Sequence, residues 1–504
     1  MRLCAVGMGG CGGSLVGRFL KDRDVLIKGW SIGSPLSSVS GIWIDADATE
    51  AGRQKRFHPQ SSGYPHYLIL HSIIPSTSRT SRLVQEKYGY DLKKQGFFRQ
   101  AEFLKAVFEI FQADEEVVLT AQRELGSGNP ILRYLWESIY PYTSLYEARN
   151  GRHGLCDGMV LAASLGGGTG TGLMDPLARY IRSKSSTFPI LALGILTENG
   201  LDSQQGADEQ KRNLSAMIAI NDLMTEPRSI GLDGLILADN QVLFEKFGRE
   251  YSIIDDFIQR SLSPLISERP YPGQDLPGLA LREQLLETLE SPPILIPCYS
   301  QERGSGRDVV NAALDTGRLC ECDPGQADRA YVFFSSSSDV SEIKDAIYEK
   351  TGLKECDVLA YRRLPGQGRD QVLILLRNPL GRGSINDPGT LECRLYWMTQ
   401  KALGYIEGHR PDIIYAGMPD LTKSALESYF YGGQGLSRAL ERSLSSLEQG
   451  HGPAFQEGLK IFDGKSLGSA LGPAWHGLQE DHLRRIARAE IEKMLQSRDL
   501  PASG

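Results

Sequence analysis

The sequence predicts an α/β fold in which a mostly parallel sheet is covered by helices. Short apolar segments typical of buried strands alternate with helical patterns along the first half of the chain. Two of these segments, 3–6 and 159–164, lead directly into glycine-rich loops at 7–13 and 166–172, and a helical pattern follows each loop. Because parallel sheets bind ligands at the carboxyl ends of their strands, we expect the loops to converge on one binding site.

The other elements of the first half follow the same order. Further strands are expected at 39–44, 189–196 and 231–240, and a helix at 208–224. A third glycine-rich loop, 125–130, precedes another helical run and is also expected at a strand end. Residues 51–124 contain helical patterns but no glycine loop. We assign residues 1–250 to one domain with an insertion at about 51–124.

The second half predicts a core helix and a smaller α/β unit. Apolar residues at helical spacing indicate the core helix over 251–266, which Pro264 should kink or end. A proline- and glycine-rich stretch completes the region 251–290. Strand and helix patterns predict a second, smaller α/β domain over 291–383, and residues 384–504 form a largely helical C-terminal extension.

Composition excludes several classes of protein. The chain has 504 residues, enough for about three domains and for a large core without disulfides. Its formal net charge of −7 argues against nucleic-acid binding as a property of the whole chain. The 8 cysteines are scattered, and the lone C-x-C at 320–322 is a weak candidate for metal ligation. No apolar run reaches the roughly 18 residues of a membrane span. We expect a cytoplasmic protein without a metal-ligand cluster.

The loop 166–172 has the composition of a phosphate-binding loop. Its glycines allow close approach of the backbone, successive N–H groups can form a concave anion site, and the following helix adds partial positive charge. The candidate contacts are Gly166, Gly167, Gly168, Thr169, Gly170, Thr171 and Gly172, with both threonines as hydroxyl donors. It is not a Walker A loop, because no lysine follows the glycines.

The first loop also matches the dinucleotide pattern G-x-G-x-x-G. A dinucleotide fold expects an acidic residue about 20 residues further on, and Asp45 lies too far from Gly12 for an easy fit. The pattern alone leaves open an NAD-dependent enzyme and a plain glycine-rich turn. The phosphate-type loop 166–172 argues against the NAD-dependent enzyme.

The heptapeptide Gly-Gly-Gly-Thr-Gly-Thr-Gly at 166–172 resembles the signature of the tubulin/FtsZ superfamily, and weaker motifs occur in that family's order over about 1–380. The resemblance implies a Rossmann-like GTP-binding domain that binds GTP or GDP with Mg²⁺. Beyond the heptapeptide it implicates Gly9, Gly10, Cys11, Gly12 and Ser14 in the opening loop, Asp45 and Asp47 near the ribose or phosphates, Gly126, Ser127, Gly128 and Asn129 near the γ-phosphate, and Asn240 and Asp255 at the guanine.

Each weaker motif has a purely structural alternative. Asn240 could form an Asx turn after its strand, and Asp47 could cap the next helix. Asp255 could lie on a solvated helix face. The segment 126–129 could be an ordinary turn.

The resemblance also implies how GTP would be hydrolysed. In the tubulin/FtsZ family, a loop of the neighbouring subunit supplies an acid that positions the attacking water, so hydrolysis depends on head-to-tail assembly. Here this loop departs from the FtsZ pattern Asn-x-Asp-x-x-Asp. Counting forward from the core helix, Asp275 falls on the first acid; counting back from the next strand, Glu283 falls on the second. We favour Glu283, whose alternative is a first-turn helix residue that complements the helix dipole.

Two functions remain. The first is a GTPase that assembles with further copies of itself into filaments, with the C-terminal helices near 436–447 and 482–496 as a surface for a filament-associated protein. The second is a GTP-binding switch or scaffold of the same fold that does not polymerise or hydrolyse efficiently. The irregular loop 267–282 favours the second.

Overall fold

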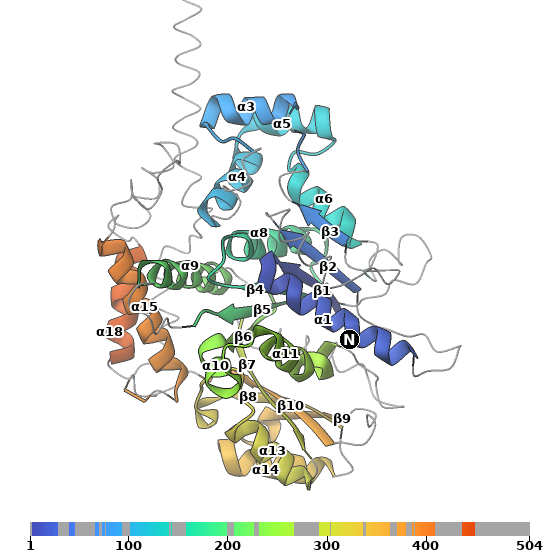
Figure 1. The fold of residues 1–504 in the computed structure, drawn as a ribbon, viewed down its shortest axis with the longest axis vertical. Coiled ribbons are helices and arrows are strands. Elements are labelled where there is room, and N and C mark those ends of the chain that lie inside the picture. Colours follow the sequence, from blue (N-terminus) through green and yellow to red (C-terminus); the bar gives the residue numbers. More distant parts are fainter. Residues whose placement is uncertain are drawn as a thin grey trace, which may run out of the picture.

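A computed structural model describes residues 3–28, 40–45, 66–69, 73–75, 77–92, 101–140, 143, 158–198, 206–225, 231–266, 292–302, 304–335, 339–362, 370–379, 386–387, 389–408 and 436–448. The predicted α/β class is confirmed: helices cover both faces of a central sheet (Figure 1). None of the described helices combines the length and the apolar composition that a membrane span requires.

The sheet has ten strands in the order β3-β2-β1-β4-β5-β6-β7-β10-β8-β9. The strands are β1 (Leu3–Met8), β2 (Ser40–Asp45), β3 (His66–Ile69), β4 (Gly158–Ser164), β5 (Ile190–Leu196), β6 (Gly234–Asp239), β7 (Ile294–Glu302), β8 (Arg329–Ser335), β9 (Val358–Arg362) and β10 (Asp370–Arg377). All neighbours from β3 to β7 are parallel, so their carboxyl ends share one edge. Strand β10 is antiparallel to β7 and β8, and β9 is parallel to β8.

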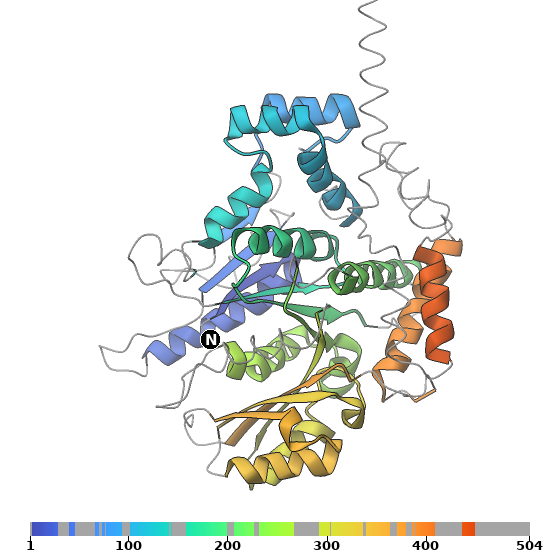
Figure 2. The ribbon, with the colours of Figure 1, turned by 180° about the vertical axis from the view of Figure 1, so that it is seen from behind.

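Helices form two apolar cores, one on each face of the sheet (Figure 2). The described helices are α1 (Gly9–Lys28), α3 (Arg79–Tyr88), α4 (Ala101–Ala113), α5 (Glu115–Leu125), α6 (Pro130–Ile139), α8 (Gly168–Lys184), α9 (Gly206–Thr225), α10 (Asn240–Phe247), α11 (Tyr251–Ile266), α13 (Gly306–Asp315), α14 (Val340–Thr351), α15 (Leu391–Gly408) and α18 (Leu436–Glu448). One core contains Leu15 of α1 and Ile258 of α11, and the other contains Leu177 of α8 and Leu214 of α9. The core helix expected at 251–266 is confirmed as α11.

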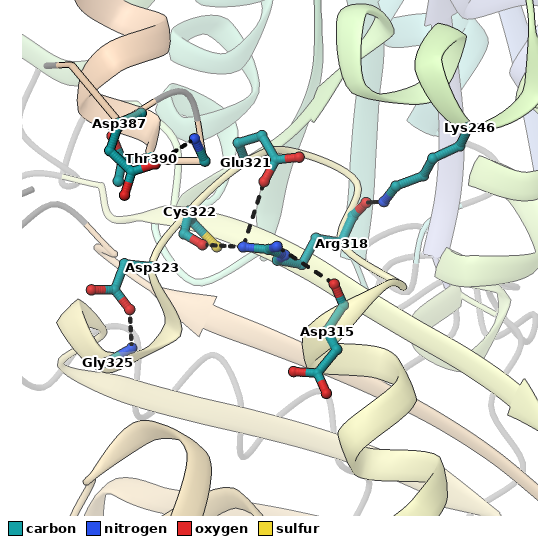
Figure 3. Close-up of polar contacts among 10 residues, drawn as sticks. Lys246, Asp315, Arg318, Glu321, Cys322, Asp323, Gly325, Asp387 and Thr390 are labelled. Carbon is teal, nitrogen blue, oxygen red and sulfur yellow. Dashed lines mark hydrogen bonds and ion pairs between the residues drawn. The ribbon is translucent and has the colours of Figure 1, made fainter. Parts of the chain in front are cut away.

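The second half of the sheet continues the first through a narrow connection. Strands β6 and β7 pair only through Leu235 with Ile294 and Ile236 with Leu295. A loop after α13 strengthens this junction, because Lys246 of α10 donates to the carbonyl of Arg318 (Figure 3). The sheet is therefore continuous, and the division into domains stays a prediction. Helix α14 was expected from the sequence, whereas α13 and β3 were not.

The region expected to be an insertion contains β3 and helices α3, α4 and α5. Helices α3 and α5 lie side by side away from the sheet, whereas α4 packs against α8 (Figures 1 and 2). Glu124, at the end of α5, accepts hydrogen bonds from the backbone N–H groups of Arg79 and Thr80 at 2.8 and 2.9 Å. A carboxylate of α5 thus satisfies the exposed donors at the start of α3.

Asp114 makes the second tie between these helices. It accepts a hydrogen bond from the Tyr88 hydroxyl, pairs with Lys87 at 3.2 Å, and caps α5 through the N–H of Val117 at 2.9 Å. Burial alone would raise the pKa of Asp114, but these contacts outweigh burial and lower the pKa below its ordinary value. The ionised carboxylate therefore stabilises the α3–α5 pair.

Helices α15 and α18 are the described part of the C-terminal extension. Helix α15 packs on α9, where Lys401 pairs with Glu209, and α18 packs on α15 with Leu440 fully buried. The helix expected near 436–447 is confirmed as α18. The helix expected at 482–496 lies outside the described residues.

Replacing Asp114 with alanine should loosen α3 from α5, because the change removes a helix cap and the partner of Tyr88. We expect the local opening free energy to fall by about 2 kcal/mol. Hydrogen exchange should accelerate in α3 and α5 and stay unchanged in β4. Glu86→Ala, at an exposed position of α3, is the matched control.

The pH dependence follows from the lowered pKa of Asp114. The contribution of ionised Asp114 to the stability of the α3–α5 pair is complete above the ordinary aspartate pKa of about 4. This contribution is lost as the pH falls through the lower, folded-state value. The difference between wild type and Asp114→Asn should therefore disappear in acid. Identical exchange in both proteins at pH 7 would contradict this account.

Candidate functional site

Two helices begin side by side at the carboxyl edge of the sheet. Strands β1 and β4 are parallel neighbours, with Met8 beside Ala163, and they lead into α1 at Gly9 and α8 at Gly168. A β-carbon placed on Gly9 would lie 3.7 Å from Cβ of Thr169, so the two helix starts are in contact. Their first-turn N–H groups and partial positive charges meet in one place, which suits an anion.

The glycine segments are helical turns rather than loops. Helix α1 already includes Gly10, Cys11, Gly12 and Ser14, and α8 includes the stretch 168–172. Gly10, Cys11, Gly167 and Gly168 are partly exposed, whereas Gly172 is buried. Glycine has a low helix propensity, but packing against the sheet overrides it here. Pro176 consequently lies inside α8.

Three glycines are required by close packing. A β-carbon on Gly12 would lie 2.1 Å from the carbonyl oxygen of Ala162 in β4. One on Gly170 would lie 2.4 Å from Cβ of Ala163, and one on Gly166 would lie 2.1 Å from Cγ2 of Thr197. Such distances exclude any side chain. These three glycines bring both helix starts close to the strand ends.

The two threonines of the heptapeptide have different roles. The Thr171 hydroxyl is buried and donates to the carbonyl of Leu165 at 2.5 Å. It closes the turn before α8 and is not free to donate to a ligand, which corrects the expectation that both threonines are hydroxyl donors. Thr169, beside Gly9, stays a candidate.

Asp255 of α11 contacts the start of α1. Its buried carboxylate accepts a 2.6 Å hydrogen bond from the Ser14 hydroxyl and lies 3.7 Å from Nε of Arg18. Burial raises the pKa of Asp255, and Ser14 and Arg18 only partly oppose this. Burial, followed by the negative charges of Asp255 and Glu198, raises the pKa of the Cys11 thiol to about 12. The raised pKa favours the neutral thiol of Cys11 at this site.

Glu198 and Tyr251 belong to the same cluster, although the sequence reading missed both. Glu198 follows β5, pairs with Arg212 at 3.1 Å, and lies 3.5 Å from the Tyr251 hydroxyl. Tyr251 precedes Asp255 by one helical turn, and its side chain is 53% exposed, so the ring is available to a ligand. The four-residue spacing on the core helix was the signal that could have identified Tyr251.

Asn240 is the first residue of α10, directly after β6, and is nearly buried. The side chain that caps this helix belongs to Asp239, which accepts from the N–H of Gln241 at 2.9 Å. The turn after β6 is therefore closed by the Asp239 side chain and not by that of Asn240. Asp239 is in turn bound by Arg394 of α15, a residue without any sequence signal.

The structure corrects the expected strand-end position of Gly126, Ser127, Gly128 and Asn129, whereas their role near the γ-phosphate stays a prediction. This segment joins two helices and does not end a strand. Gly126 ends α5 in the left-handed conformation (φ 72°), and Asn129 caps α6 through the N–H of Leu132. Asn129 also lines a cavity with Arg179, in the C-terminal half of α8, whereas the heptapeptide forms the N-terminus of that helix. Glycine and asparagine are present because they are good helix caps.

The remaining candidates are acidic. Asp45 is buried at the end of β2, next to β1, and therefore lies at the same edge of the sheet as the two helix starts. Asp47, Asp275 and Glu283 lie outside the described residues, and their roles stay predictions.

Known proteins share this fold. No sequence family and no curated protein matches the chain. CetZ from Methanosaeta thermophila strain DSM 6194 is 16% identical, with a TM-score of 0.50 over 82% of this chain and 96% of that one. CetZ2 from Haloferax volcanii, solved as a GTPγS-bound protofilament, is 17% identical, with a TM-score of 0.50 over 81% and 99%. The likeness concerns the fold, and it confirms the predicted resemblance to the tubulin/FtsZ superfamily at that level.

Thr171→Val should destabilise the turn before α8, because it removes the hydroxyl and leaves the Leu165 carbonyl unsatisfied. The expected loss is about 1–3 kcal/mol in the free energy of unfolding. Thr171→Ser retains the hydroxyl and should stay closer to wild type in the same denaturation experiment. Equal stability of the valine and serine variants would show that this hydrogen bond is unimportant.

Asp255→Asn should raise the melting temperature at pH 7, because asparagine avoids burying a charge. Because the pKa of Asp255 is raised in the folded protein, its protonated form is the one that favours folding. This contribution to stability is complete below the ordinary pKa of about 4 and is lost as the pH rises through the folded-state value. The advantage of the variant should therefore appear above pH 4 and vanish in acid. A lower melting temperature than wild type at pH 7 would refute this.

Proposed function

We propose that the chain binds a guanine nucleotide, with its phosphates at the starts of α1 and α8 and its base beside α11 and Asn240. The observation that carries the proposal is the hydrogen bond between Ser14 and Asp255. Because a residue of the α1 start directly contacts a residue of α11, an anion at the helix starts and a base beside α11 can belong to one ligand.

The side chains near α11 suit a guanine base. An ionised Asp255 accepts hydrogen bonds, and guanine presents N–H donors on one edge. The amide of Asn240 offers both a donor and an acceptor, which matches the mixed character of that edge. The exposed Tyr251 ring lies one turn from Asp255 and can stack on the base. Donors of the base would also favour the ionised form of Asp255 and offset the cost of its burial.

Magnesium would accompany the phosphates. The described residues hold no group of three or more His, Cys, Asp or Glu side chains placed to bind a metal ion. Phosphate oxygens and water would therefore supply most of the ligands, which is the usual situation for Mg²⁺. Asp45, at the edge where both helices begin, can supply one carboxylate or contact the ribose.

We further propose that the protein hydrolyses GTP and assembles head-to-tail. Phosphoryl transfer requires a positioned phosphate, a counter-ion and an oriented water, and little covalent chemistry from the protein. An acid from a neighbouring copy, Glu283 or else Asp275, would orient the water. The CetZ2 protofilament supports assembly, because that protein has the same fold and was solved in an assembled state. A head-to-tail contact of this kind propagates into a filament.

A GTP-binding switch or scaffold that neither assembles nor hydrolyses efficiently is the second candidate. The α3–α5 pair favours it, since this pair stands away from the sheet and enlarges one end of the molecule (Figure 1). Such an extension can bind a different partner or obstruct a neighbouring copy.

Sedimentation and phosphate release distinguish the two candidates. With GTP and Mg²⁺ we expect the protein to pellet in the ultracentrifuge and its specific activity to rise with concentration, because the neighbour completes the site. GDP is the matched control and should give less pellet. A flat, near-zero rate without pelleting would establish the second candidate and refute the first.

Glu283→Gln should retain GTP binding and slow hydrolysis, because the amide cannot accept the proton of the attacking water. We expect a loss of at least about 100-fold in turnover. Asp275→Asn, measured in parallel, should have the smaller effect. Wild-type turnover in the Glu283 variant would exclude this residue as the catalytic acid.

A further inference from the structure

Arg394 of α15 holds together the ends of two strands. Its Nε and Nη2 donate to the two carboxylate oxygens of Asp239 at 2.6 and 3.1 Å, and Nη2 also donates to the carbonyl of Thr197. Asp239 ends β6, and Thr197 directly follows β5. The arginine side chain is 7% exposed and the aspartate is fully buried, so solvent cannot replace this contact.

Both strand ends carry residues of the proposed base site. Asp239 immediately precedes Asn240 and caps the helix that Asn240 begins. Thr197 immediately precedes Glu198, which lies against Tyr251. The guanidinium therefore fixes the backbone of two segments whose next residues surround the base. Arg394 does not belong to the starts of α1 and α8, where the phosphates are proposed to bind.

Asp239 is held by its backbone as well as by its side chain. Its backbone N–H donates to the carbonyl of Leu319 at 2.7 Å, in the loop shown in Figure 3 between Arg318 and Cys322. Burial alone would lower the pKa of Arg394, but the charge of Asp239 outweighs burial and raises the pKa, so the guanidinium stays charged. Without the arginine, Asp239 would be a buried, unpaired charge and the end of β6 would have to move.

We propose that Arg394 is a positioning residue for recognition of the base: α15, far along the chain, sets the geometry with which Asn240 and the end of β5 meet guanine. The inference rests on the proposed nucleotide site. It predicts that contacts with the base depend on Arg394, whereas contacts with the phosphates do not.

The competing interpretation is a buried ion pair that only stabilises the fold. Arg377 of β10 provides a control. Its side chain is equally buried, at 7% exposure, and its Nε also lies 2.6 Å from a carboxylate, that of Asp328, although the Asp328 side chain is 42% exposed. Arg377 pairs with Leu295, near the start of β7, so it lies at the opposite edge of the sheet from the end of β6.

The test measures the affinities of wild type, Arg394→Met and Arg377→Met for two ligands in the presence of Mg²⁺. Calorimetric titration gives the affinity for GTP, and competition against GTP gives the affinity for inorganic triphosphate. Arg394→Met should weaken GTP binding by about tenfold, equivalent to about 1.4 kcal/mol, and leave the affinity for inorganic triphosphate within about twofold of wild type. Arg377→Met should change neither affinity. Equal losses for both ligands, which a purely structural role predicts, would overturn the proposal, and so would an equal loss of GTP affinity in the Arg377→Met control.

Arg394→Lys covers the case in which the methionine variant does not fold. Lysine keeps the charge but loses the two-pronged contact, so GTP affinity should fall less, in the same direction, with triphosphate affinity unchanged. A lysine variant with a lower melting temperature and wild-type affinity for GTP would also overturn the proposal. Failure of wild type to bind GTP would instead refute the nucleotide site itself, which keeps the two conclusions separate.

Discussion

The site depends on how closely α1 approaches β4. A β-carbon on Gly12 would lie 2.1 Å from the carbonyl oxygen of Ala162, and one on Gly13 would lie 2.0 Å from the indole ring of Trp43. No side chain fits at either position, so a larger residue would push α1 away from the sheet. Only at this separation can Gly9 meet Thr169 and the two helix starts act on one anion. Glycine at positions 12 and 13 is thus a packing requirement.

The proposed base region depends instead on polar contacts between segments that are far apart in the sequence. Ser14 binds Asp255 across 241 residues of sequence, and Arg394 binds Asp239 across 155. Such contacts are strongest when the geometry is good and water is excluded; the Arg394–Asp239 pair is buried and the Ser14–Asp255 contact is partly buried. The C-terminal helix α15 therefore contacts the proposed nucleotide site and is not an appendage on the surface of the molecule. Helix α1 connects the proposed phosphate and base regions, because it contributes residues to both.

Sequence reasoning could predict the elements that depend on local pattern. The apolar strands, the heptapeptide 166–172 and the spacing of α11 are local, and the structure contains all of them. It wrongly placed 126–129 at the end of a strand, because glycine and asparagine are as typical of adjacent helix caps as of a phosphate loop. It could not identify the partner of the Thr171 hydroxyl or the contact of Arg394, because both depend on tertiary packing. Helix starts were placed too late, since glycine propensity gives no indication of packing against a strand.

Hydrogen exchange with and without GTP tests the central claim most directly, because it reports where the nucleotide binds without altering any residue. The account predicts protection of backbone amides in 9–14, 167–171 and 251–255 and at the start of α10. No protection at the starts of α1 and α8 at saturating GTP would contradict it.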